Sequence, residues 1–198
     1  MSLKISTYVQ IRGGQSYLNG ENFLAVEGEE FLKEFYKQLQ IDYSKFYKMD
    51  DLCKVGMVAT EILISKRPDL LQKEDDAIAM VFQSENGCLQ TDADHQADVD
   101  AEKASPAVFV YTLSNIVCGE ISIRFKWFGE SIFFINDSKD TKNLLTYSKS
   151  LILSGKAECC LVGRLEVFGG DISADLVLIE NSNEGHELED LQSILDSK

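Results

Sequence analysis

Short apolar runs of strand length alternate along the chain with segments in which apolar residues recur every three or four positions. The run Ala77–Phe82 is continuously apolar, which is typical of a central parallel strand that is covered on both faces. The segment Asp50–Lys66 has helical spacing and ends before Pro68, because the residue before a proline disfavours the helical conformation. This alternation predicts an α/β fold with a mostly parallel sheet.

Other segments have the same two patterns, apolar runs of strand length or helical spacing of apolar residues. The further strands expected are Leu3–Ile11 and Ala174–Ile179, and the further helices are Glu29–Gln40, Ser114–Phe125 and Glu184–Leu195. Residues Gln15–Val26 have no period and are expected to be irregular. Ser84–Ser105 is polar, acidic and patternless, and a connection of this length is a candidate functional or interface loop.

The segment Ser131–Glu166 has the pattern of a βαβ unit. It predicts an apolar strand, a turn at Asn136-Asp137-Ser138, roughly four turns of helix ending at Gly155, and a second strand, Ala157–Val162. Ser138 is thereby expected at a helix N-terminus, where outward-pointing backbone N–H groups favour an anion or a nucleophile. The alternative is that Asp137 or Ser138 is simply an N-cap, since both residue types prefer that position.

Charge excludes two classes of partner. The net charge of the 198-residue chain is −14, whereas nucleic acids and anionic membranes attract basic surfaces, so neither is expected to bind. The acidic residues gather at 92–102 and 184–196, which are expected to be a solvated loop and tail. No apolar run is long enough for a membrane span and no signal peptide is recognisable, so a cytoplasmic protein is expected.

The cysteines are odd in number and have no metal-like spacing. They are expected to be small core residues in a reducing compartment, not a disulfide framework or a zinc site. No metal or other cofactor is expected. The five are Cys53, Cys88, Cys118, Cys159 and Cys160.

The central segment resembles the nucleophile region of the β-ketoacyl synthases, condensing enzymes of the thiolase-like fold. Gly129-Glu130 stands where the family has a GP pair, and Gly163-Arg164-Leu165-Glu166 stands at its GG-x-E pattern. The helix that precedes Gly129-Glu130 and starts near Asn115 is similar to the family's N-x-x-x-G-x-I helix. Aligned without a gap, the catalytic cysteine of the family falls on Ser138.

The resemblance implies half of a thiolase-like fold: a mixed, mostly parallel five-stranded sheet with helices on its faces. Residues 1–198 are then one ketoacyl-synthase N-terminal-like domain, with a core at about 1–181 and an acidic tail or helix at 182–198. A full condensing enzyme of the family has a second repeat that carries two histidines. Neither His95 nor His186 stands at a family histidine position.

The resemblance therefore implies a non-condensing accessory subunit of fatty-acid or polyketide biosynthesis, of the aryl polyene type. Its expected partner is a true synthase, with an acyl carrier protein as a further candidate. One alternative is an acyltransferase or decarboxylase that uses Ser138 and is completed by another chain, since a serine nucleophile needs an oriented base. Another is a structural remnant that serves only assembly.

Two features bear on partners. Lys139, Lys142 and Lys149 fall on one side of the expected central helix, a position that a full synthase buries, so they imply solvent or an acidic partner.

In the thiolase-like family the strand before the nucleophile pairs with its counterpart across a two-fold axis, which implies a homodimer or a heterodimer with a full-length synthase. An uncharged edge strand such as this needs a cover. The expected interface residues are Ser131, Ile132, Phe133, Phe134, Ile135 and Asn136.

Overall fold

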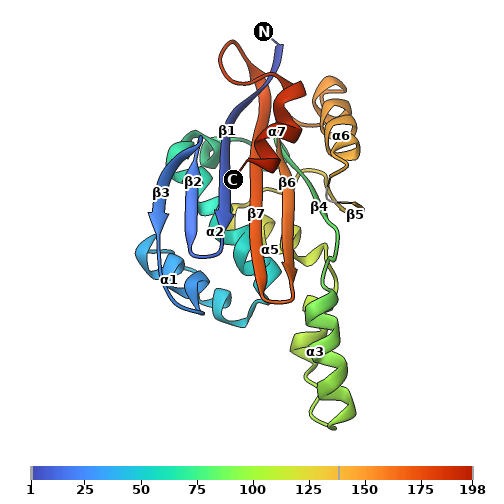
Figure 1. Ribbon diagram of the computed structural model, residues 1–198. Helices are drawn as coiled ribbons and strands as arrows, with labels where there is room; N and C mark the ends of the chain where they lie inside the picture. The colour runs from blue at the N-terminus through green and yellow to red at the C-terminus, as the bar shows by residue number, and fades with distance from the viewer. Residues whose placement is uncertain (1, 138, 198) are drawn as a thin grey trace.

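The computed structural model describes residues 2–137 and 139–197, and it contains one seven-stranded mixed sheet in the order β3-β2-β1-β7-β6-β4-β5 (Figure 1). The strands are β1 (Ser2–Arg12), β2 (Gln15–Leu18), β3 (Glu21–Ala25), β4 (Ile78–Ser84), β5 (Ser131–Ile135), β6 (Cys159–Phe168) and β7 (Asp171–Ser182). An α/β architecture is confirmed. The expectation of five mostly parallel strands is wrong, because only the β4–β5 and β4–β6 pairs are parallel.

Two chain reversals account for this difference. Gly169 and Gly170 both have positive φ, at 62° and 91°, and form the tight connection that returns β6 antiparallel as β7. The segment Gln15–Val26, expected to be irregular, forms the short strands β2 and β3 beside β1. These strands are partly exposed and carry no clear alternation, so backbone pairing of β2 with β1 and of β3 with β2 determines their structure.

β4 is the centre of the parallel part. All seven of its residues are buried, and it pairs with β5 on one side and β6 on the other. The continuous apolar run supplies side chains to both faces of the sheet, as expected for a central strand. β5 is the outermost strand on this side.

Helices cover both faces of the sheet (Figure 1). The helical elements are α1 (Phe31–Gln38), η1 (Ser44–Lys48), α2 (Asp51–Lys66), η2 (Pro68–Gln72), α3 (Leu89–Asp100), α4 (Pro106–Phe109), η3 (Val110–Thr112), α5 (Ile116–Phe125), α6 (Lys142–Leu153), η4 (Leu188–Asp190) and α7 (Leu191–Asp196). One apolar core lies between the sheet and α1, α2 and α5. A second core lies on the opposite face, under α6 and α7.

The C-terminal segment contributes to this second core. Leu188, Leu191, Ile194 and Leu195 are buried against the sheet, together with Leu144 and Leu151 of α6. Burial therefore extends past residue 181, where the sequence placed the limit of the core. The acidic residues of this segment stay on its outer side.

The connection 84–105 contains a helix. α3 spans twelve residues of the segment expected to be patternless, and none of its residues is buried. It extends away from the sheet at the lower end of the view in Figure 1. A helix without a buried face leaves no apolar period in the sequence, which is why the pattern does not predict it.

Within the described ranges no single helix is long and apolar enough to cross a membrane. Two consecutive helical segments, Pro106–Thr112 and Ile116–Phe125, would be long and apolar enough only if taken together. They are bent by 102° at the break between them.

Candidate functional site

The site expected from the sequence lies at the turn after β5. Ser138, the residue aligned with the nucleophile of the family, is outside the described residues. The helix expected to follow this turn directly begins only at Lys142, after an N-cap at Thr141. Its C-terminal end is as expected, since Gly155 has φ 73° just beyond the helix.

Side chains of the turn explain this later start. The Asp137 carboxylate accepts a hydrogen bond from the Lys139 N–H at 2.8 Å, and the Asp140 carboxylate accepts one from the Lys142 N–H at 2.9 Å. The Asn136 amide donates to the Asp140 carbonyl at 3.1 Å. Short polar side chains that bond the local backbone compete with the helix and favour a turn.

Glu166 holds the adjacent turn after β4. Its carboxylate accepts hydrogen bonds from the Ser84 hydroxyl at 2.9 Å and from the backbone N–H of Glu85. The Ser84 hydroxyl accepts from the Gly87 N–H at 2.7 Å, and the Ser84 carbonyl accepts from the Asn136 N–H at 3.1 Å. The carboxyl ends of β4, β5 and β6 are therefore joined through Ser84 and Glu166.

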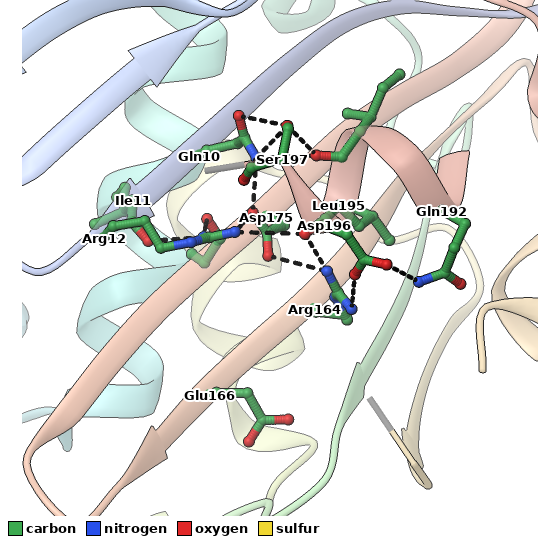
Figure 2. A network of polar contacts seen from close by, with 12 residues as sticks. Gln10, Ile11, Arg12, Arg164, Glu166, Asp175, Gln192, Leu195, Asp196 and Ser197 are labelled. Carbon is green, nitrogen blue, oxygen red and sulfur yellow. Dashed lines mark hydrogen bonds and ion pairs between the residues drawn. The ribbon is translucent and has the colours of Figure 1, made fainter. Parts of the chain in front are cut away.

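A buried polar network lies beside these strand ends, on the face covered by α7 (Figure 2). Asp175 of β7 is only 4% exposed and accepts from the Arg12 guanidinium at 2.6 Å, with the Arg164 guanidinium at 3.6 Å. Arg164 of β6 also pairs with Asp196 at 2.9 Å and donates to the carbonyl of Leu195, both on α7. The network therefore ties α7 to the sheet.

Charge and burial act in opposite directions on this network. Burial raises the pKa of Asp175, while the nearby Arg12 and Arg164 guanidinium groups lower it. A hydrogen bond from Gln192 lowers the pKa of Asp196, and the bond from Arg164 acts in the same direction. Both arginines thus stabilise the charged carboxylates on which the docking of α7 depends.

The roles of Arg12, Gln10 and Asp175 were not predicted from the sequence. The Gln10 amide donates to the Ile194 carbonyl at 2.9 Å and to Asp175 at 3.3 Å. A signal was present, because Asp175 interrupts an apolar strand pattern at a position that shares a face with Val177 and Ile179. A charged residue at an inward position of a strand indicates a buried partner.

No family model matches the sequence, and no curated protein matches it. The fold is similar to a ketosynthase (ApeO) in complex with its chain length factor (ApeC) from Xenorhabdus doucetiae, with 16% identity, a TM-score of 0.64, and coverage of 92% of this chain and 80% of that one. It is also similar to the complex AntDE:AntF, a type II PKS acyl-carrier protein with its ketosynthase bound to the hexaketide (13%, TM-score 0.65, 96% and 64%). A third match is the ishigamide ketosynthase/chain length factor (13%, TM-score 0.64, 93% and 63%).

The chain has a thiolase-like ketosynthase fold. The resemblance carried by Asn115–Glu166 is thereby confirmed for the fold. The chain spans just under two thirds of the length of the second and third of these structures.

Condensation by ketosynthases requires a cysteine thiolate, as the sequence resemblance implies. The thiols of this chain are instead held in the protonated form. All five cysteines are buried. Burial raises the pKa of Cys88 to about 11 and that of Cys118, Cys159 and Cys160 to about 12, and it raises the pKa of Cys53 well above its ordinary value. A thiol with such a pKa is almost wholly protonated at neutral pH and is a poor nucleophile.

The histidines lie on other parts of the ketosynthase fold. His95 is on α3, with its ring 5.7 Å from that of Phe109. His186 pairs through its backbone with Ile5 and contacts the Tyr8 ring at 5.6 Å. The alternative of acyl transfer or decarboxylation uses Ser138 with a partner chain; Ser138 is outside the described residues, and neither histidine lies on the turn between β5 and α6.

Within residues 2–137 and 139–197, no group of three or more histidine, cysteine or acidic side chains is arranged to hold a metal ion.

Proposed function

We propose that this protein is a non-condensing accessory subunit of a polyketide or fatty-acid type pathway, of the aryl polyene kind. The observation that carries the proposal is the state of its thiols: a ketosynthase fold in which every cysteine is buried and has a raised pKa. The sequence places a serine where the family has its nucleophilic cysteine. Such a chain contributes a surface to an assembly and leaves condensation to a partner.

The proposed partner is a ketosynthase, in a heterodimer. Two of the similar structures join a ketosynthase to a chain length factor, and one joins a ketosynthase to an acyl-carrier protein. A homodimer is the second arrangement that the same surface would allow. The proposed location is the cytoplasm, where reducing conditions keep buried cysteines as free thiols.

The proposed interface is the edge strand β5 with Asn136. Among the described strands β5 pairs only with β4. The Glu130 carbonyl accepts from the Met80 N–H at 3.0 Å, and the Asn136 N–H donates to the Ser84 carbonyl at 3.1 Å. Because hydrogen-bonding direction alternates along a strand, even-numbered residues bond β4 and Ser131, Phe133 and Ile135 point their backbone groups to the open edge.

The side chains of this edge divide between core and surface. Phe133 packs against the core under α2 and α5, and Phe134 packs against the core under α6. Ile135 is 58% exposed. An uncharged edge with an exposed isoleucine is a template for strand pairing unless another chain covers it.

Substitutions at Ile135 test this interface without removing a core side chain. Ile135→Pro deletes an outward N–H but no bond to β4, and Ile135→Lys adds a charge at the same place. We expect each to weaken association with a co-expressed ketosynthase, or self-association, about tenfold or more. Ile135→Val is the matched control and should associate as the wild type does. Masses in solution, measured by light scattering, report the result.

A wild-type chain that stays monomeric alone and with a ketosynthase would contradict the proposal. So would complexes that persist unchanged in the Ile135→Pro and Ile135→Lys variants. Thermal unfolding of each variant confirms that it is folded before its association is judged.

A further inference from the structure

A row of polar side chains crosses the apolar sheet face that α7 covers (Figure 2). Asp175 of β7 lies directly opposite Gln10 of β1 and Arg164 of β6 in the sheet register, and all three are at most 8% exposed. Their neighbours on this face are apolar, for example Val162 and Val177. A buried polar row is unfavourable unless its members have partners, so these partners show what the face binds.

The strands alone leave this row with an excess of positive charge. Among the strand residues, the guanidinium groups of Arg12 and Arg164 share the carboxylate of Asp175. A second carboxylate comes from α7, because Asp196 pairs with Arg164 at 2.9 Å. A buried guanidinium group without a counter-charge is strongly unfavourable, so the face requires an anionic group from outside the sheet.

The end of α7 also supplies backbone acceptors to the row. The Gln10 amide donates to the carbonyls of Ile194 at 2.9 Å and of Ser197 at 3.1 Å, and the Arg164 guanidinium donates to the carbonyl of Leu195. The C-terminal end of a helix has unpaired carbonyls and a partial negative charge. The face therefore contacts α7 as a receptor contacts an acidic peptide.

Apolar side chains complete this contact. Leu188 of η4 and Leu191 and Leu195 of α7 are buried against the sheet. α7 has only six residues, and a helix of that length is not stable by itself in water. Its structure depends on the sheet face beneath it, so the same segment from another chain can fold in the same place.

A short connection leads from β7 to this segment. Residues 183–187 are all exposed, and Gly185 has φ 118°. Directly after Gly185, the backbone of His186 pairs with that of Ile5 at 3.0 and 2.9 Å. A short hinge before a terminal segment favours the exchange of that segment between copies.

We propose that this sheet face is a binding site for the C-terminal segment of a second copy of the chain, and that α7 occupies it within a single copy. The occupant is residues 183–197, with Asp196 as its anionic group and Leu191 and Leu195 as its apolar groups. Two copies that exchange these segments form a dimer whose contacts are those already present in one copy. The proposal is independent of the proposed function and of pairing through β5.

Within one copy the connection favours the chain's own α7. A short flexible tether gives an effective concentration in the millimolar range, about a thousand times that of a partner at micromolar concentration. A second segment therefore competes when the tethered one is weakened or when the protein is concentrated.

The test is the binding of a fluorescein-labelled peptide of residues 183–197 to the full-length protein, measured by anisotropy. Asp196→Arg in the protein weakens its own α7 and leaves the sheet residues unchanged, so the wild-type peptide should bind this variant about tenfold or more tightly than it binds the wild-type protein. A peptide that carries Asp196→Arg should bind the same variant about tenfold or more weakly than the wild-type peptide does.

The matched control is a peptide with Glu184→Arg. It changes the charge equally at an exposed residue that has no ion pair within the described ranges, and it should bind within about twofold of the wild-type peptide. Asp196→Asn in the protein removes the charge without reversing it, and it takes the place of Asp196→Arg if thermal unfolding shows that Asp196→Arg is not folded.

The peptide experiment also separates this site from the edge strand. Adding Ile135→Pro to the Asp196→Arg protein should leave peptide binding unchanged, and concentrated Ile135→Pro protein should form a dimer that excess peptide dissociates. A peptide that binds none of the proteins, that binds equally with aspartate or arginine at position 196, or that loses binding with Ile135→Pro would overturn the proposal. So would an Ile135→Pro protein that stays monomeric up to millimolar concentration.

Discussion

The Arg164→Ala variant is expected to lose about 3–5 kcal/mol of folding free energy. Arg164 is 8% exposed and links Asp175 in the sheet to Asp196 and the Leu195 carbonyl in α7. Its removal leaves a buried carboxylate with one guanidinium partner in place of two, and it leaves the Leu195 carbonyl with the longer bond from Arg12, at 3.4 Å. The free energy of unfolding, from urea denaturation, measures the loss.

Local release of α7 should accompany this loss. Leu191 and Leu195 are held against the sheet by the same helix, so hydrogen exchange should rise across 188–197 before the rest of the protein. Lys33→Ala is the matched control, because Lys33 is about a third exposed and pairs with the exposed Glu30 on the surface, so it should lose at most about 1 kcal/mol. An Arg164→Ala protein that loses no more than this control, or whose exchange at 188–197 does not rise, would show that Arg164 does not anchor α7.

The Gly163→Ala variant is expected to be destabilised by about 4 kcal/mol or more. A Cβ atom at Gly163 would lie 1.9 Å from the Asp175 carbonyl oxygen on the neighbouring strand, so β6 and β7 would have to separate. The contact is with backbone, which has little freedom to move within a paired sheet.

Gly119→Ala is the control for this substitution. Gly119 is exposed on α5 with no atom within 4 Å of an added Cβ, and alanine there should stabilise the protein by about 0.5–1 kcal/mol. Thermal unfolding of both variants distinguishes close packing at Gly163 from a general effect of alanine. A Gly163→Ala protein as stable as the wild type would show that β6 and β7 can separate at no cost.

Elements with a strong apolar period were predictable from the sequence. The run at 77–82 became β4, and the helical spacing at 50–66 became α2 with little change in its limits. The prediction succeeds for these segments because the burial of apolar side chains determines both their secondary structure and their sequence pattern. The hairpin at Gly169-Gly170 and the strands β2 and β3 depend on backbone pairing between successive strands, which an apolar pattern does not contain.

Candidate chemistry was predictable in part. The resemblance around Glu166 identified the segment whose strand ends meet in the site. The helical spacing of the lysines also predicted that Lys142 and Lys149 lie on one side of α6, where they line a single hollow. The start of α6 was not predictable from helical spacing, since Asp137 and Asp140 bond the local backbone. The contacts among Gln10, Arg12 and Asp175 cross more than 160 residues of sequence, and only the fold brings them together.

The intact mass of the protein after incubation with malonyl- and acyl-loaded carrier protein tests the proposed non-condensing role most directly. We expect an unchanged mass, with and without a ketosynthase present, because buried thiols with raised pKa values do not accept an acyl group. A stable acyl adduct on this chain would contradict it. An adduct that maps to Ser138 and disappears in the Ser138→Ala variant would establish an acyl-transfer enzyme in its place.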